Sequence, residues 1–388
     1  QCFHRPYGLF VEGEWIAMAE DPEVGGQGFP AIIRQAAFEY ISGANYAMGA
    51  FGDLGHGTAK MIEIFGSAKQ KALFLKKVYS GEWGGTMLLT EPGAGSDVGA
   101  LTTTAVKNPD GTYSISGNKI FITCGDHDLT ENIIHLVIAR IEGAPEGVKG
   151  ISLFVVPKKK VNPDGSVEGS NDVLCGGVED KLGLHASPTC VLNFGSSDDC
   201  VGYLCGEPNK GLAHMFQMMN AARINTGVSG MTLASTAYQN ALAYAKMRVQ
   251  GRDIAGRKDE SVPIIDHPDV RRMLLWMKAA VEGMRSMIYA GAYWSDFALE
   301  LPDGDEKRYY QNLVDFITPI IKACCSEIGF RVCETALQCF GGYGYTREYP
   351  LEQYLRDVKI MSLYEGTNGI QSMDLLGRKM RVNDGAPF

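Results

Sequence analysis

The spacing of apolar side chains changes twice along the chain and divides it into three parts. Between residues 59 and 80, apolar residues recur every three or four positions, which is the spacing of one face of a helix. A shorter apolar helix is expected over residues 32–46, and turns rich in glycine and proline precede it. We therefore predict that the first part of the chain is mostly α-helical.

The second part, from about residue 87 to residue 205, has the short apolar runs that are typical of strands. Asn108-Pro109-Asp110-Gly111 separates two alternating runs as a hairpin turn does, and Asn162-Pro163-Asp164-Gly165 is a second turn sequence. Strands that follow one another without helices between them usually pair antiparallel, so we expect a small sandwich or barrel. The predicted strands cover residues 101–106, 112–116, 119–123, 133–141 and 151–156.

From residue 209 onward the helical spacing returns, and prolines at positions 263, 268, 302 and 350 separate four expected long helices. The predicted fold is multi-domain α+β. It has an N-terminal α-helical domain over residues 1–86, a middle antiparallel β domain over 87–207 and a C-terminal four-helix bundle over 208–388. Because the chain begins without methionine, we expect that an upstream piece is absent and that the first domain is incomplete.

Composition and charge narrow the class of protein. The 388 residues include 36 Lys and Arg against 45 Asp and Glu, and the net charge of −9 argues against a general binder of nucleic acid or anionic membranes. The longest charge-free stretch, residues 224–245, contains too many Asn, Thr, Ser and Gln side chains for a membrane span. No secretory signal is visible at the start, so we expect a cytoplasmic protein without a membrane span.

The ten cysteines do not indicate a metal or redox site, because none of them form a Cys-x-x-Cys pair. Cys124 and His127 are the nearest approach to a pair of ligands. A cysteine at a strand end beside a loop histidine explains them better than zinc does, so no metal is predicted.

Several motifs carry candidate chemistry, each with an ordinary structural explanation. The glycines of Thr90-Glu91-Pro92-Gly93-Ala94-Gly95-Ser96 favour a tight turn, although such a loop also presents backbone N–H groups to a polar ligand. Phe121 and Thr123 alternate with Ile122, which places a ring and a hydroxyl on one face of a strand. That face suits a flat heterocycle, and it suits an ordinary sheet core equally well.

Two further motifs lie in the helical part. Arg248 and Arg252 close the long helix, where a favourable interaction with the helix dipole is sufficient to explain them. The functional alternative is that they bind phosphate. Glu365 stands before an expected helix, beside Tyr364 and Gly366. Its side chain is interpreted as a solvated acid, or as a partly desolvated carboxylate whose raised pKa suits a general base.

Together, these motifs resemble the acyl-CoA dehydrogenases over residues 14–378, in both order and approximate spacing. Their larger subgroup, which includes 3-methylmercaptopropionyl-CoA dehydrogenase, is the most similar. The residues that carry the resemblance are Thr90-Glu91-Pro92-Gly93-Ala94-Gly95-Ser96-Asp97, Ile122-Thr123, Arg223, Arg248-x-Gln250, Gln338-x-x-Gly341-Gly342-x-Gly344-Tyr345 and Tyr364-Glu365-Gly366-Thr367.

The resemblance implies FAD as the cofactor and a set of residues that hold it. Leu89, Thr90, Phe121 and Thr123 are expected to face the isoalloxazine, and Ser96 to lie between the flavin and the CoA pantetheine. By the same resemblance, Arg248 and Gln250 reach the FAD pyrophosphate of a neighbouring subunit. Gln338 and Gly342 likewise contact the nucleotide of the neighbouring subunit's FAD, and Thr367 lies near the adenine end.

The resemblance also implies an activity and the residues that serve it. Glu365 is expected to remove the α proton of an acyl-CoA thioester while the β hydrogen leaves as hydride, giving a 2-enoyl-CoA. Electrons pass to an electron-transfer flavoprotein, and the chain forms a homodimer or homotetramer. Asn220 and Arg223 contact CoA, and Tyr364 and Gly366 complete the substrate site.

Some positions depart from the family pattern. Phe121 stands where many members have Trp, and Asn220 where several have Asp. Ala222 precedes Arg223, where members with the base on the long helix carry Glu, so Glu365 has no rival as base. The alternatives left open are an oxidase of the same fold that uses oxygen and a non-catalytic flavin- or CoA-binding protein. The residues leave the acyl group undefined.

Overall fold

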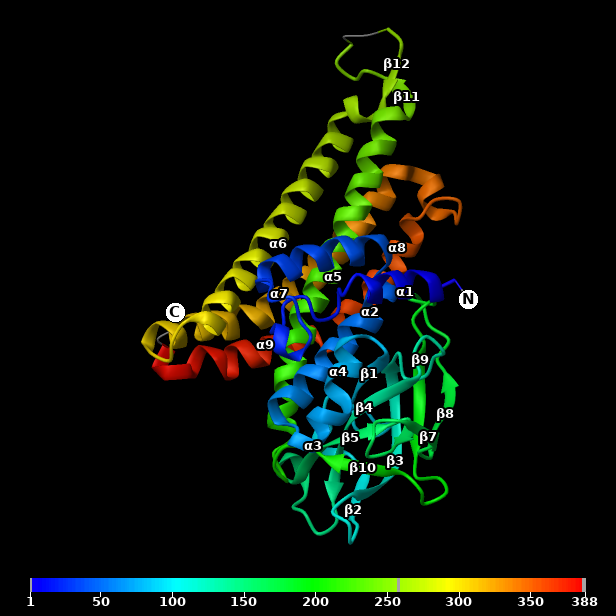
Figure 1. Ribbon diagram of the computed structural model, residues 1–388. Coiled ribbons are helices and arrows are strands. Elements are labelled where there is room, and N and C mark those ends of the chain that lie inside the picture. Colours follow the sequence, from blue (N-terminus) through cyan, green and yellow to red (C-terminus); the bar gives the residue numbers. More distant parts are fainter. Residues whose placement is uncertain (1, 257–258, 386–388) are drawn as a thin grey trace. The chain divides into compact units, whose positions relative to one another are not determined.

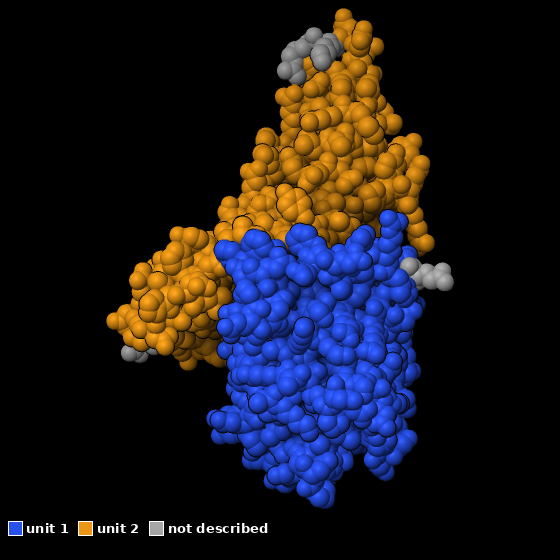
Figure 2. All heavy atoms as spheres, in the orientation of Figure 1, with its two compact units in different colours: residues 1–30, 47–181, 185–221 blue, residues 31–46, 182–184, 222–388 orange. Residues whose placement is uncertain are grey.

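The computed structural model describes residues 2–256 and 259–385. Contacts within the chain divide it into two compact units (Figure 2). Unit 1 contains residues 1–30, 47–181 and 185–221, and unit 2 contains residues 31–46, 182–184 and 222–388. The predicted domain boundaries at residues 86 and 207 stay a prediction.

Unit 1 begins with helices, but the helix predicted over residues 59–80 is interrupted at Gly66 and Ser67, whose backbones are extended. A capping box starts the helical segment after residue 66, where the Ser67 hydroxyl accepts from the Gln70 N–H and the Gln70 side chain accepts from the Ser67 N–H. The helix α2 is interrupted at Asn45, whose φ of −161° and ψ of 96° are not helical, and the residues after Tyr46 belong to unit 1. The helices are α1 (His4–Glu12), α2 (Ala31–Phe65), α3 (Ala68–Gln70) and α4 (Lys76–Tyr79), with a π-helical turn over Lys71–Leu75.

A β-sheet forms the rest of unit 1, in the strand order β1-β4-β5-β10-β3-β9-β8, with β2 beside β3 and β4 (Figure 1). The Asn108–Gly111 turn joins β2 to β3 as an antiparallel hairpin, as predicted. A second hairpin, β6–β7, is joined by the turn at residues 162–165. The strands are β1 (Trp83–Leu88), β2 (Thr104–Lys107), β3 (Tyr113–Thr123), β4 (Asn132–Ile141), β5 (Ile151–Pro157), β6 (Lys159–Val161), β7 (Val167–Ser170), β8 (Val173–Val178), β9 (Thr189–Phe194) and β10 (Val201–Leu204).

The prediction of purely antiparallel pairing is wrong in two places, because β1 and β2 both pair parallel to β4. A parallel neighbour needs a long crossover. The chain from β1 to β4 supplies one by passing through the Glu91 loop and the β2–β3 hairpin. The sheet is therefore mixed, although most of its pairs are antiparallel.

Both faces of the central strands β4 and β5 are buried. Along β4 and β5, side chains alternate between two apolar clusters, with Leu136 and Leu153 in one and Val137 and Phe154 in the other. The first cluster includes Ile62 of α2, so helices cover that face. Burial on both faces explains why residues 133–141 read as a nearly continuous apolar run.

Unit 2 is helical, and its core joins side chains of α2, α5, α6, α7 and α8. The expectation of four long helices is corrected to three within the described residues, because the final part is divided into α8 and α9. The helices are α5 (Gly211–Met247), whose residues from 222 belong to this unit, α6 (Pro268–Glu300), α7 (Asp305–Phe340), α8 (Leu351–Val358) and α9 (Asn368–Gly377).

The arginines expected to close α5 lie beyond its end. Arg248 follows the helix, and Arg252 lies in β11 (Val249–Arg252), which pairs with β12 (Ser261–Pro263) (Figure 1). The helix-dipole explanation therefore does not account for Arg252. None of the helices in the described residues combines the length and apolar character that a membrane span requires.

Candidate active site

The loop after β1 is held by a buried carboxylate. Glu91 accepts hydrogen bonds from the Thr102 N–H (2.6 Å) and hydroxyl (2.7 Å) and from the Thr103 N–H (3.1 Å) and hydroxyl (2.5 Å). A tight turn follows, in which Glu91 and Ala94 exchange backbone hydrogen bonds. The turn expected from Gly93 is present, and Ser96 lies on its exposed side.

Lys119 of β3 joins this loop to the sheet. Its ammonium donates to a Glu91 carboxylate oxygen (2.8 Å) and to the Leu89 carbonyl (3.1 Å), and the side chain is fully buried. Burial acts to raise the pKa of Glu91, but Lys119 and the threonine donors lower it to about 2. Burial lowers the pKa of Lys119 to about 8, with the Glu91 charge opposing the shift. Both groups are therefore charged at neutral pH.

The predicted flavin-facing residues of unit 1 come together at this point. The Ile120 N–H donates to the Thr90 carbonyl (3.0 Å), so Leu89 and Thr90 lie beside the end of β3 that carries Phe121 and Thr123. Leu89, Thr90 and Thr123 are half-buried. The structure thus gathers four predicted residues around one loop and one strand end.

Phe121 has an unusual conformation within this group. Its φ is 58°, it stands where the pairing of β3 with β9 is irregular, and its ring is 59% exposed. The left-handed region is unfavourable for a bulky side chain. An exposed ring in that conformation adds little to the apolar core, and the role of Phe121 beside the flavin stays a prediction.

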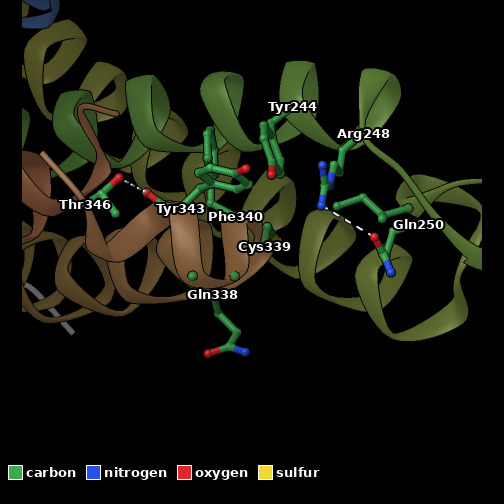
Figure 3. A pocket seen from close by; sticks show the side chains of 11 residues that line it. Tyr244, Arg248, Gln250, Gln338, Cys339, Phe340, Tyr343 and Thr346 are labelled. Atoms are coloured by element: carbon green, nitrogen blue, oxygen red, sulfur yellow. Dashed lines mark hydrogen bonds between the residues drawn. The ribbon is translucent and has the colours of Figure 1, made fainter. Parts of the chain in front are cut away.

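A pocket in unit 2 brings together most of the residues predicted to hold the nucleotide, although Thr367 does not line it (Figure 3). Its volume is about 470 Å³. The lining includes four predicted residues, which are Arg248, Gln250, Gln338 and Gly342.

The aromatic side chains give this pocket a flat wall. Tyr244 and Phe340 stack with their ring centroids 4.0 Å apart, and the Arg248 guanidinium lies 5.6 Å from the centroid of the Tyr343 ring. Arg248 also approaches Gln250 at 3.4 Å, and the Gln338 side chain extends away from Tyr244 and Phe340 (Figure 3). A guanidinium, two amides and an open glycine backbone form a donor set that suits a diphosphate next to an aromatic ring.

The loop that carries Glu365 has a left-handed backbone at two consecutive residues. The φ angles are 55° at Glu365 and 81° at Gly366, and the Glu365 side chain is half-buried. The Gln371 amide donates to the carbonyls of Glu365 (3.2 Å) and Gly366 (3.0 Å). A strained conformation of this kind persists only where surrounding contacts hold it.

The other predicted residues of this loop make internal contacts. The Tyr364 hydroxyl lies 2.5 Å from the Tyr46 hydroxyl, and the Thr367 hydroxyl caps α9 by accepting from the Ile370 N–H. Burial, together with Tyr46, raises the pKa of Tyr364 well above its usual value. The assigned roles of Tyr364, Gly366 and Thr367 toward substrate or cofactor stay predictions.

Arg223 and Asn220 both lie on α5. Arg223 is buried, its guanidinium is 2.9 Å from the Asp374 carboxylate, and Glu365 also contributes to its electrostatic environment. Asn220, in the part of α5 that belongs to unit 1, is half-buried. The contact of these two residues with CoA stays a prediction.

Comparisons with known proteins identify the family. The model described as "Acyl-CoA dehydrogenase, middle domain" matches residues 86–197, and the model described as "Acyl-CoA dehydrogenase, C-terminal domain" matches residues 209–380. The chain belongs to the acyl-CoA dehydrogenase family.

Two curated members of this family are similar over nearly the whole chain. 3-Methylmercaptopropionyl-CoA dehydrogenase of Ruegeria pomeroyi is 45% identical over 99% of this chain and 64% of the relative. A butyryl-CoA dehydrogenase of Syntrophomonas wolfei is 44% identical over 100% of this chain and 64% of the relative. The chain therefore spans less than two thirds of the length of these two relatives.

Solved structures agree with the three-part acyl-CoA dehydrogenase fold. An acyl-CoA dehydrogenase from Bacillus anthracis, solved in complex with FAD, has a TM-score of 0.83 and 26% identity over 98% of this chain and 62% of that one. A structure from work on the electron transferring flavoprotein of Acidaminococcus fermentans has a TM-score of 0.79 and 28% identity, over 95% of this chain and 87% of that one. The predicted fold class of helices, β domain and helices is confirmed.

Two charged residues of the candidate site had no role in the sequence-based prediction. Lys119 is paired with Glu91, and Lys322 of α7 is fully buried with its ammonium 2.6 Å from the Gly366 carbonyl. Glu91 belongs to a motif typical of acyl-CoA dehydrogenases, and a buried partner for it was a reasonable expectation. No spacing signal links Lys322 to residue 366.

Proposed function

We propose that this chain is the catalytic part of an FAD-dependent acyl-CoA dehydrogenase that converts an acyl-CoA thioester to a 2-enoyl-CoA. The observation that carries the proposal is the Glu365 loop. A half-buried carboxylate stands on a strained backbone that Gln371 and Lys322 hold, in a chain that belongs to this family. Glu365 is the proposed catalytic base.

The residues present fit FAD. In unit 2, Arg248 and Gln250 supply donors, beside stacked aromatic rings, for the diphosphate of the FAD that a neighbouring subunit binds. Gly341 and Gly342 leave open space where a Cβ would project. In unit 1, Phe121 and Thr123 offer an exposed ring and a hydroxyl next to Leu89 and Thr90. When bound, FAD supplies the acceptor for the hydride from the β carbon.

The protein's own task is to remove a proton from a weak carbon acid. An α C–H beside a thioester is too weakly acidic for a carboxylate in water, so the carboxylate must be held near that carbon and away from bulk solvent. Backbone N–H donors near the thioester oxygen stabilise the negative charge that develops there. Arg223 and Asn220 are the proposed CoA contacts, and Tyr364 and Gly366 the proposed walls of the acyl site.

The proposed electron acceptor is an electron-transfer flavoprotein, and the proposed assembly is a homodimer or homotetramer. Both follow from the family and not from a contact in the described residues. The acyl group is left open, although the two relatives named above suggest butyryl-CoA and 3-methylmercaptopropionyl-CoA as the first probes.

The test is anaerobic reduction of the bound flavin. We expect the purified protein to be yellow and to lose its flavin absorbance when it is mixed with one of these two acyl-CoA probes without oxygen. Steady oxygen consumption without an added acceptor would show an oxidase instead. A protein that binds FAD and acyl-CoA without any bleaching, across short, branched and thioether acyl chains, would contradict the proposal.

A further inference from the structure

A buried ammonium lies beneath the loop that carries Glu365. Lys322 of α7 has no exposed surface, and its ammonium lies 2.6 Å from the Gly366 carbonyl and 3.1 Å from the Asn368 side-chain oxygen. Each distance is that of a good hydrogen bond donated by a charged group. Gly366 lies between Glu365 and α9, and Asn368 is the first residue of α9.

Helix α7 holds residues 366–368 at more than one point. The Ser326 hydroxyl, one turn after Lys322, donates to the same Asn368 oxygen (3.1 Å). The Gly366 carbonyl accepts from both Lys322 and the Gln371 amide. The backbone that begins at Glu365 is therefore fixed from α7 on one side and from α9 on the other.

A fully buried lysine at this position is energetically unfavourable unless its ammonium has partners. Burying an ammonium requires partners that compensate for its lost hydration. The Lys322 ammonium donates to a neutral carbonyl and to a neutral amide oxygen. Burial lowers the pKa of Lys322 to about 8, and the Glu365 carboxylate opposes that shift. The positive charge of Arg223 acts on Lys322 in the same direction as burial and lowers its pKa further.

From this geometry we infer that Lys322 is the positioning residue for the proposed base. It holds the Gly366 carbonyl and the Asn368 side chain so that Glu365 keeps its left-handed backbone. The inference rests on the proposed function of Glu365. Lys322 acts through Glu365, without a contact to substrate of its own.

The test is a double-mutant cycle in the holoenzyme, with anaerobic flavin reduction by butyryl-CoA or 3-methylmercaptopropionyl-CoA as the readout. We expect Lys322→Met, which keeps the length of the side chain but removes its charge and donors, to slow reduction about 10- to 100-fold. Bound FAD and the dissociation constant for the acyl-CoA are expected to stay within about twofold of the wild type. Lys278→Met, which removes an exposed lysine of α6, is the matched control and is expected to leave the rate unchanged.

The cycle separates positioning from general support of the fold. Adding Lys322→Met to Glu365→Gln is expected to cause less than about a twofold further loss, because the residue through which Lys322 acts is already absent. The inference would be overturned if the rate loss in the double variant equalled the product of the losses in the two single variants. A wild-type rate of flavin reduction in Lys322→Met would also overturn it. If Glu365→Gln itself reduces its flavin at the wild-type rate, the proposed function fails instead.

A second variant guards against a folding defect. Lys322→Gln retains a hydrogen-bond donor but no charge, and we expect its rate to lie between those of the wild type and Lys322→Met. If both variants lack bound FAD, or no longer unfold cooperatively, then Lys322 serves only the stability of the fold and the inference is wrong.

Discussion

The Lys119 ammonium lies 2.8 Å from the Glu91 carboxylate in the interior of unit 1, and neither side chain has appreciable contact with solvent. This ion pair ties the loop after β1 to β3, and with it Leu89 and Thr90 to the strand end that bears Phe121. The pair therefore links the stability of unit 1 to the arrangement of the proposed flavin site.

Removing one charge of this pair is expected to be costly. Glu91→Gln leaves Lys119 buried without its counter-ion, which typically lowers the free energy of unfolding by about 3–5 kcal/mol. Urea denaturation at pH 7 measures the change. Glu168→Gln, at an exposed position of β7, is the control, and an equal loss in both variants would contradict the account.

Because of the same ion pair, we expect the free energy of unfolding to fall at acidic pH. The pKa of Glu91 is about 2 in the folded chain and 4.5 ordinarily, so the unfolded chain takes up this proton first as the pH falls. The stabilisation from Glu91 is complete above pH 4.5 and is lost progressively between pH 4.5 and 2, by an amount on the order of 3 kcal/mol. Denaturation at several pH values is expected to show a shallower acid dependence in Glu91→Gln. An unchanged slope would show that the pKa of Glu91 is the same in the folded and unfolded chain.

Replacing Phe121 is expected to have opposite effects on the stability of the apoprotein and on its affinity for FAD. Phe121→Gly removes an exposed ring and relieves a left-handed backbone, so the apoprotein is expected to be as stable as the wild type or more stable by up to about 1 kcal/mol. FAD is expected to bind more weakly, because the proposed stacking surface is lost. Asp198→Gly, at another exposed residue with positive φ, is the matched control, and it should leave FAD affinity unchanged. A large loss of apoprotein stability in Phe121→Gly would mean that the ring serves the fold.

Arg248 is expected to contribute directly to cofactor affinity. Arg248→Ala removes the only arginine among the described residues that line the unit 2 pocket, and loss of hydrogen bonds to a charged group costs about 1.5–3 kcal/mol. The dissociation constant for FAD is therefore expected to rise about 10- to 100-fold, as measured by fluorescence titration of the apoprotein. Arg308→Ala, on an exposed position of α7, serves as the control. Equal FAD affinity in the two variants would remove Arg248 from the proposed site.

Local patterns account for the parts of the fold that were predicted. The Asn108–Gly111 turn forms because Asp110 accepts from the Thr112 N–H two residues later, an interaction visible in the sequence. The buried strand β4 follows from its apolar run. By contrast, the parallel pairing of β1 with β4 has no local signal, because β1 contains two glycines and its partner lies more than forty residues away.

The residues of the candidate site also fall into those that the sequence indicates and those that only the structure reveals. Phe121, Arg248 and Glu365 belong to motifs that mark them in the sequence, whereas their supports are distant residues. Lys119 meets Glu91 across 28 positions, and Lys322 meets Gly366 across 44. Side chains that meet only after folding leave no periodicity, so both lysines required the structure.

The central claim is that Glu365 removes the α proton, and anaerobic stopped-flow reduction of the Glu365→Gln holoenzyme tests it most directly. With butyryl-CoA or 3-methylmercaptopropionyl-CoA as the probe, we predict flavin reduction about 10²- to 10⁴-fold slower than in the wild type, with bound FAD unchanged. Glu327→Gln, at an exposed carboxylate of α7, should reduce its flavin at the wild-type rate. Reduction of the Glu365→Gln enzyme within about twofold of the wild type would contradict the account.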